Sequence, residues 1–447
     1  MADLVEQLLS QLNDDKHPCT VDLNKCGPDI TRDFTTAAQS LLDNVDCVDA
    51  SRMDVFIQLA YQKLTSLPQS RSLCWRRLYT DACIFKALVA VTDPTRVGES
   101  TALETIATLD HAIIIAGAAG EGRLALILSL VREVQSIFLS TPSPDVTSPD
   151  FCADVPPRLP NCPTSCGDIL CISPPPSFTA FQNCWAQTPF ILRNYISDWP
   201  AMTERPWASV NYLRSIAGPG RIVPVEVGED YRSDDWTQEL INWDTFLSSL
   251  DPSRPRPKKR EVLYLAQHNL MAQFPALRDD IVVPDYVYSC LAPPRSFPGY
   301  TPPGNEEQFV INAWLGPKGT ISPAHTDPFF NCYAQVVGRK TVWLAPPDVS
   351  KHMYPYSAPA SDTADKTHNP AANTTNPLMS NTSRVDVFPS SDGAERRSKE
   401  EFPAFWENVP KKASCAILEA GDLLVFPPGW WHAMRSEETS FSVSMWF

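Results

Sequence analysis

The sequence is most informative at two short stretches, Ser322-Pro323-Ala324-His325-Thr326-Asp327-Pro328 and Phe426-Pro427-Pro428-Gly429-Trp430-Trp431-His432. In the first stretch a histidine and an aspartate lie two residues apart, so both side chains project from the same face if the backbone is extended. In the second, a histidine follows an apolar run and a tight turn. We expect His325, Asp327 and His432 to bind one metal ion.

This ligand set also indicates the kind of metal. Two imidazoles and one carboxylate on one side of an ion leave open positions, which is the arrangement of non-haem Fe(II) oxygenases. A bidentate 2-oxoacid and O2 fill such positions, whereas a structural zinc site takes a fourth protein ligand. The two stretches therefore predict an Fe(II)-dependent oxygenase.

Around these motifs the hydrophobic pattern is of two kinds. From about residue 34 to residue 140 apolar residues recur at helical spacing, as at Met53, Phe56 and Ile57. After residue 176, short apolar runs separated by Pro and Gly predict many short strands, as in a β-sandwich or jelly roll. We expect an all-α domain over residues 1–145, a Pro- and Ser-rich linker over 146–176 and an all-β domain over 177–447.

Three segments of the chain carry local predictions. Residues 441–447 alternate apolar side chains with serines, which predicts a strand with one buried face. Residues 355–400 are mostly polar, and we expect a surface loop without a chemical role there. The basic run at 257–260 is typical of a nuclear import signal, and equally of a solvated loop.

Composition narrows the class of partner and the compartment. The 447 residues carry a formal net charge of -15, which argues against nucleic-acid binding and suits a basic peptide better. No apolar stretch is long enough to cross a bilayer and no signal peptide is evident, so we expect a nuclear or cytoplasmic protein that is not secreted. Thirteen cysteines, an odd number, predict free thiols rather than a disulfide framework.

The second half of the chain resembles the JmjC-domain oxygenases, and within them the arginyl hydroxylases. Besides the two metal stretches, the likeness rests on the segments 223–228, 264–268, 284–286, 311–317, 338–340, 381–383 and 440–444. The resemblance implies a double-stranded β-helix, the jelly-roll cupin fold, with flanking helices. It also implies Fe(II) as the metal and 2-oxoglutarate and O2 as co-substrates.

The resemblance further implies roles for residues around the metal. Lys340 would pair with the distal carboxylate of 2-oxoglutarate, because a dianion in an apolar barrel needs a fixed cation and donors. Hydrogen bonds to 2-oxoglutarate are implied for Tyr286, Ser322 and Asn331. Contacts with an arginyl side chain of the protein substrate are implied for Glu226, Trp236 and Trp314.

Two alternatives to arginyl hydroxylation stay open. The same oxygenase chemistry on an N-methyl carbon would make the protein a methyl-lysine demethylase, because a carboxylate-lined pocket suits either cation. An alternative of another class is a catalytically silent cupin that serves as a protein-binding module. Oligomeric state and the role of the helical domain do not follow from the sequence.

Overall fold

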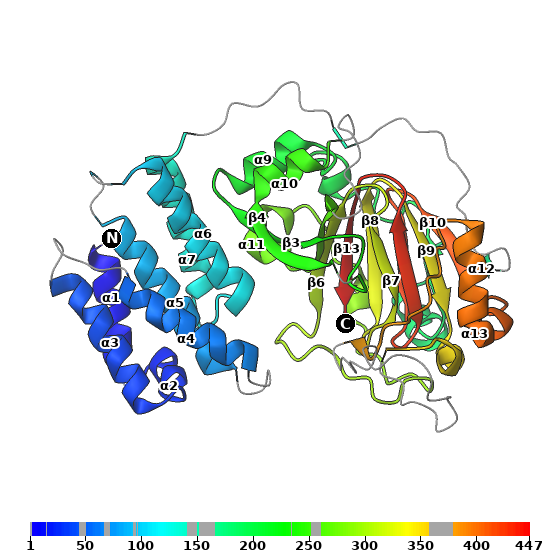
Figure 1. Ribbon diagram of the computed structural model, residues 1–447, viewed down its shortest axis with the longest axis horizontal. Helices are drawn as coiled ribbons and strands as arrows, with labels where there is room; N and C mark the ends of the chain where they lie inside the picture. Colours follow the sequence, from blue (N-terminus) through cyan, green and yellow to red (C-terminus); the bar gives the residue numbers. More distant parts are fainter. Residues whose placement is uncertain are drawn as a thin grey trace.

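The computed structural model describes residues 2–14, 16–43, 51–66, 72–92, 95, 97–140, 150–151, 166–233, 235–251, 261–356 and 379–447. Within these ranges a helical N-terminal region precedes a sheet-rich C-terminal part, as the sequence predicts (Figure 1). None of the described helices combines the length and apolar character that a membrane span requires. The basic run at 257–260 lies outside the described residues.

The N-terminal region is built around a buried central helix. Its described helices are α1 (Ala2–Asn13), α2 (Pro18–Asn24), α3 (Pro28–Asp43), α4 (Ser51–Ser66), α5 (Leu73–Ala90), α6 (Glu99–Ala116) and α7 (Arg123–Phe138). Helix α5 packs between α4 and α6, and buries side chains all round, among them Leu78, Ile84 and Phe85. Such a helix is stabilised mainly by packing, since it has no polar face to solvent.

Two β-sheets make up the C-terminal part. The eight-stranded sheet has the order β2 (Phe190–Leu192), β11 (Leu423–Phe426), β8 (Asn331–Val337), β13 (Ser440–Trp446), β6 (Val310–Gly316), β5 (Leu263–His268), β3 (Ile222–Val227), β4 (Thr237–Asn242). The five-stranded sheet has the order β1 (Gly167–Asp168), β10 (Ser414–Leu418), β9 (Lys340–Ala345), β12 (Trp431–Ser436), β7 (Ile321–Thr326).

Helices cover the outer faces of both sheets (Figure 1). Helices α9 (Val210–Ala217), α10 (Trp243–Ser249) and α11 (Leu270–Gln273) pack with the eight-stranded sheet, and α13 (Pro403–Asn408) packs with the five-stranded one, next to α12 (Asp392–Glu401). A smaller apolar cluster that includes Tyr333, Leu344 and Met434 lies between the sheets. Successive side chains on each strand therefore point alternately to the space between the sheets and to the helices.

The last strand differs from its prediction in one respect. Residues 440–446 do form strand β13, but both of its faces are buried. Phe441, Val443 and Met445 join the helix-covered core, while the serines of the other face are also fully buried and contact polar groups such as Gln335. The prediction of a single buried face is wrong because alternating apolar and polar residues show only that the two faces differ in polarity. Here the polar face lines the space between the two sheets.

The polar segment 355–400 is also more ordered than expected over its second half. Residues 357–378 lie outside the described residues, but Val385, Val387 and Phe388 are buried in the core under the five-stranded sheet. Helix α12 then closes the segment. The prediction of a plain surface loop is therefore wrong from residue 379 onward.

The end of the expected linker belongs to the sheet. Most of residues 146–176 lie outside the described ranges, but β1 pairs in parallel with β10 and Ile169 is buried. Nine described cysteines are free, as expected. Cys415 is disulfide-bonded, so the prediction of free thiols fails at this residue.

The helical region contacts the sheet-rich part through a buried ion pair. Asp110 of α6 accepts three hydrogen bonds from the Arg221 guanidinium, at 2.7, 3.0 and 3.0 Å, and a fourth from the Ile222 backbone N–H at 2.9 Å. The Gln273 side chain donates to the Ile222 carbonyl at 2.6 Å. The first residue of β3 lies beside β4 on one side only, and side chains satisfy its backbone groups on the other side.

Candidate metal centre and substrate pocket

The structure brings the three predicted metal ligands together. His325 lies on β7 and Asp327 just beyond its end, while His432 lies on β12, directly opposite His325 in the antiparallel register. The Nε2 atoms of His325 and His432 lie 3.9 and 3.4 Å from carboxylate oxygens of Asp327, and potential ligand atoms of all three lie within 4.8 Å of one another.

The hydrogen bonds of the two imidazoles suit metal binding. Nδ1 of His325 lies 2.7 Å from the Pro323 carbonyl oxygen, and Nδ1 of His432 lies 3.0 Å from that of Trp430. A carbonyl oxygen only accepts, so each Nδ1 carries the proton and each Nε2 presents a lone pair. Metal-binding histidines are commonly oriented in this way.

Burial favours the protonation states that a metal requires. It lowers the pKa of His325 to about 4, and the neighbouring His432 acts in the same direction. Burial tends to raise the pKa of Asp327, but His432 and His325 hold it below its usual value. Two imidazoles and one carboxylate whose ligand atoms converge form a donor set that fits a divalent transition metal.

The turn before His432 is fastened to the same site. Gly429 has a φ of 77°, which favours glycine, and its N–H donates to the Asp327 carbonyl at 2.8 Å. A Cβ at this position would come within 2.7 Å of the Phe297 ring. The glycine therefore lets the turn pack closely enough to hold Asp327 and His432 at a fixed spacing.

Lys340 is a buried cation between the sheets. Its ammonium donates to the hydroxyls of Tyr333 at 2.9 Å and Tyr264 at 3.3 Å. No carboxylate of the described residues pairs with it, and burial lowers its pKa to about 7. A cation without a counter-ion in such a place is suited to binding an anion from outside the chain.

The other residues predicted around the co-substrate divide into two groups. Ser322 lines the cavity next to the metal ligands, and Asn331 is buried on the same face of β8 as Tyr333, with its Oδ1 atom unpaired. Tyr286 is not with them. Its hydroxyl donates to the Pro176 carbonyl at 2.7 Å, and its ring packs in the helix-covered core.

Tyr264 and Tyr333 take the place that the sequence assigned to Tyr286. Tyr286 lies in a short 3-10 helix on the outer face of the eight-stranded sheet, so it cannot reach the interior. Tyr333 shares its strand face with Asn331, two residues earlier. Strand parity within 331–337 was therefore a signal that could have identified it.

All three predicted substrate residues line one cavity of about 630 Å3 that also contains His325 and Asp327. Glu226 of β3 has its pKa raised to about 7 by burial, with Trp236 opposing the shift and Asp230 adding to it. The Trp314 indole donates to the Ser444 hydroxyl at 2.9 Å, which fixes its ring. A half-buried acid and two indoles thus line the same cavity as two of the predicted metal ligands.

The segment 379–383, expected to lack a chemical role, also lines this cavity. Met379, Asn381 and Thr382 contribute to its wall. Thr382 pairs with His325 as an isolated bridge, and the Thr326 N–H donates to the Asn381 carbonyl at 3.0 Å. The segment continues the sheet beside β7, a pairing that its polar composition did not indicate.

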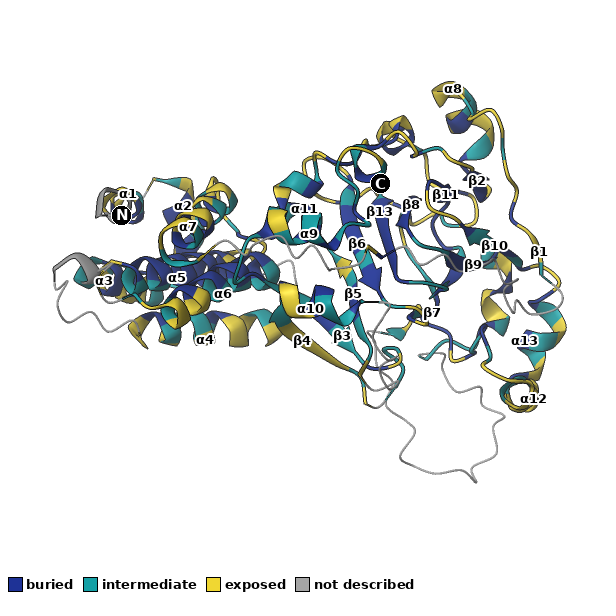
Figure 2. Ribbon diagram, turned by 90° about the horizontal axis from the view of Figure 1, so that it is seen from above, coloured by how far each residue is buried: buried dark blue, intermediate teal, exposed yellow. Residues whose placement is uncertain are grey.

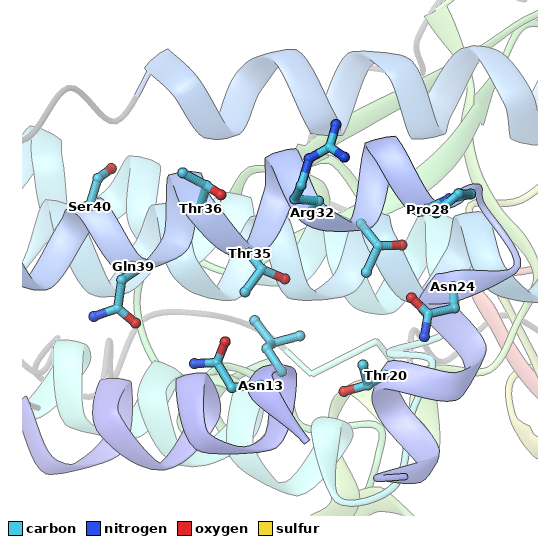
Figure 3. Close-up of a pocket in the computed structure, with 11 residues that line it drawn as sticks. Asn13, Thr20, Asn24, Pro28, Arg32, Thr35, Thr36, Gln39 and Ser40 are labelled. Atoms are coloured by element: carbon cyan, nitrogen blue, oxygen red, sulfur yellow. The ribbon is translucent and has the colours of Figure 1, made fainter. Parts of the chain in front are cut away.

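A second cavity, of about 610 Å3, lies between α1, α2 and α3 (Figure 3). Hydroxyl and amide side chains such as Asn13, Thr35 and Gln39 line most of it. Its single lining cation, Arg32, pairs with Asp29 at 2.8 Å. These lining residues supply neither a metal ligand set nor an acid–base pair, so the chemistry of the described chain is concentrated in the sheet-rich part.

The chain is similar to proteins of one family. A cupin-like domain matches residues 179–447. Jumonji C domain-containing protein 5 of Drosophila melanogaster is 33% identical over 379 residues, covering 84% of this chain and 80% of that protein. Lysine-specific demethylase 8 of Danio rerio is 32% identical over 421 residues, covering 91% and 90%. Lysine-specific demethylase JMJ30 of Arabidopsis thaliana is 36% identical over 260 residues, covering 58% and 50%.

Proposed function

Because this chain belongs to the cupin-like JmjC family of 2-oxoglutarate-dependent dioxygenases, we propose that it hydroxylates an arginyl side chain of a protein substrate. The observation that carries the proposal is the position of Glu226. This half-buried carboxylate shares a cavity with His325 and Asp327, so a cationic side chain that neutralises it also lies beside the metal site.

We infer that His325, Asp327 and His432 hold Fe(II). The iron, when bound with 2-oxoglutarate and O2, supplies the oxidant for insertion of an oxygen atom into a substrate C–H bond. The chain's own contribution is geometric. The two carbonyl acceptors of the histidine Nδ1 protons keep both rings oriented, and burial keeps His325 neutral.

Lys340 would bind the distal carboxylate of 2-oxoglutarate. Its ammonium and the hydroxyls of Tyr264 and Tyr333 form a compact group of donors inside the barrel. The Ser322 hydroxyl and the Asn331 Nδ2 group would donate further hydrogen bonds to the same co-substrate. An incoming carboxylate restores the charge of Lys340, which burial otherwise disfavours.

Glu226 would orient the substrate. A guanidinium offers paired N–H donors that match a carboxylate, and its flat faces stack on indoles such as those of Trp236 and Trp314. Binding of the cation favours the ionised form of Glu226, since opposite charges stabilise one another in a buried site. The side chain is thereby aimed at the metal ligands with little freedom to rotate.

The finer architecture follows from the same reasoning. We propose that the two facing sheets form a double-stranded β-helix with the metal site at one mouth, and that residues 1–145 and 177–447 are separate domains.

Localisation in the nucleus or cytoplasm stays a prediction.

A methyl-lysine demethylase is the second candidate, because relatives carry that name and because Glu226 also suits a methylated ammonium. Mass spectrometry of peptides after reaction separates the two. Hydroxylation adds one oxygen atom to an arginine-containing peptide, whereas demethylation removes one methyl unit from a methyl-lysine peptide. Loss of methyl units without any oxygen gain would refute the arginyl proposal.

A silent binding module is the candidate of another class. Anaerobic addition of Fe(II) and 2-oxoglutarate to the full chain tests it, since a visible charge-transfer band reports the loaded site. The band, together with succinate formed in air, is expected for the enzyme. A folded protein that gives neither would favour the silent cupin.

A further inference from the structure

Strand β4 ends the eight-stranded sheet and is exposed on its outer side. Among the described residues it pairs only with β3, and residues 237–240 are exposed (Figure 2). Edge strands with free backbone groups are places where another chain can pair. The position of β4 gives such pairing a specific use, because Trp236 and Gln238 also line the cavity of the metal site.

The hydrogen-bond pattern identifies which backbone groups of β4 point outward. The Trp243 N–H donates to the Arg221 carbonyl at 2.9 Å, and these residues lie directly opposite in the register that continues through β3 and β4. Bonded pairs alternate in an antiparallel ladder, so Ile241, Glu239 and Thr237 bond to β3. The N–H and C=O groups of Gln238 and Leu240 therefore face the free edge.

Side-chain directions connect this edge to the cavity. Gln238 lies directly opposite Glu226 in the register, so both project from the same face of the sheet. A residue of an added antiparallel strand opposite Gln238 would bond to it through both backbone groups and project from that face too. Its side chain would enter the wall of the cavity beside Glu226.

We propose that the free edge of β4 receives the extended main chain of the protein substrate as an additional strand, with the target residue opposite Gln238. This rests on the proposed function and adds how the substrate is held. Main-chain hydrogen bonds contribute to affinity whatever the sequence of the substrate, and Glu226 selects one cationic side chain. The acidic chain, at a net charge of -15, suits a cationic segment.

The geometry also predicts a preference at one neighbouring position. The substrate residue two positions from the target would lie opposite Leu240, on the same face as the target side chain. The Leu240 side chain is 37% exposed. An apolar residue at that substrate position covers it, so peptides with valine there should be preferred over those with aspartate.

Leu240→Pro tests the edge with little other change. Proline removes the outward N–H of residue 240, and it leaves the β3 ladder intact because that ladder uses the odd-numbered residues. We measure oxidation of short peptides with one central arginine between valine and threonine residues. The expected result is a KM for peptide raised about fivefold by Leu240→Pro, with kcat and peptide-independent 2-oxoglutarate turnover unchanged. Leu240→Val, which keeps the N–H and an apolar side chain, should raise this KM less than Leu240→Pro does.

A substrate-side variant covers the case in which Leu240→Pro fails to fold. N-methylation of the target arginine's backbone nitrogen removes the bond to Gln238 and should raise KM, whereas N-methylation of the next residue, whose amide faces away, should not. If these peptides are oxidised and neither the proline nor the methylation changes KM, the edge proposal is wrong while the proposed function stands. If none is oxidised or bound by wild-type protein, the substrate class itself is wrong.

Discussion

Removing the Asp110 carboxylate is expected to destabilise the protein more than any surface charge would. Asp110 is fully buried, and its oxygens accept from the Arg221 guanidinium and the Ile222 N–H. In Asp110→Ala the guanidinium keeps only the Gln273 carbonyl, at 3.0 Å, and the face of the Phe274 ring, 4.7 Å from its central carbon. A buried cation is then left without a counter-ion.

The magnitude follows from burial. Breaking a buried ion pair from one side typically costs about 3–5 kcal/mol of the free energy of unfolding, against a total of about 5–15 kcal/mol for a domain. Replacing both partners by apolar residues of similar size avoids the uncompensated charge. The double variant Asp110→Leu with Arg221→Met should therefore recover most of the loss.

Equilibrium unfolding in urea, followed by circular dichroism and tryptophan fluorescence, measures these free energies. Asp244→Ala is the matched control, because Asp244 pairs with Arg214 at the surface and is 66% exposed, so we expect a loss below about 1 kcal/mol. A loss below about 1 kcal/mol for Asp110→Ala, or a double variant no more stable than the single one, would refute the reasoning. Asp110→Ala should also raise KM for peptide, since Ile222 and Glu226 share β3.

Three further predictions concern the cavity. Asp327→Ala should lose the charge-transfer band and reduce succinate formation to background; a retained band would mean that Asp327 is not a ligand. Lys340→Met should lose 2-oxoglutarate binding in calorimetry. It should not lower the melting temperature of co-substrate-free protein, because it removes a buried cation that has no counter-ion. The control Lys412→Met, at the surface, should keep both the binding and the melting temperature. Glu226 has a raised pKa of about 7 and binds a cation only when ionised. The value of kcat/KM for arginine peptides should therefore rise about tenfold from pH ~6 to pH ~8. The same rise in a Glu226→Gln variant would contradict this explanation.

The sequence predicted the metal ligands because their spacing is local. His325 and Asp327 need only a short extended segment to share a face, and His432 needs only a strand and a turn. What it could not show is the register that places His432 opposite His325, since that depends on hydrogen bonds between distant strands.

The wrong predictions share one physical cause, because the sequence does not show which element packs on a given face of a strand or helix. Tyr286 was assigned to the interior, yet it packs under the outer helices, while Tyr264 and Tyr333 reach Lys340. The polar segment at 381–383 pairs along β7 because backbone hydrogen bonds need no apolar side chain. Family resemblance identified that segment, but its composition did not.

The register of β9 and β12 fixes how far Lys340 lies from the candidate metal site along the strands. His432 lies opposite Leu344 and Ser436 opposite Lys340, so the lysine is attached four residues, or about 13 Å, below the level of the histidine. A lysine side chain directed toward the level of His432 would span about half of that distance. We expect the remaining distance to suit a five-carbon dicarboxylate better than a four-carbon or a six-carbon one.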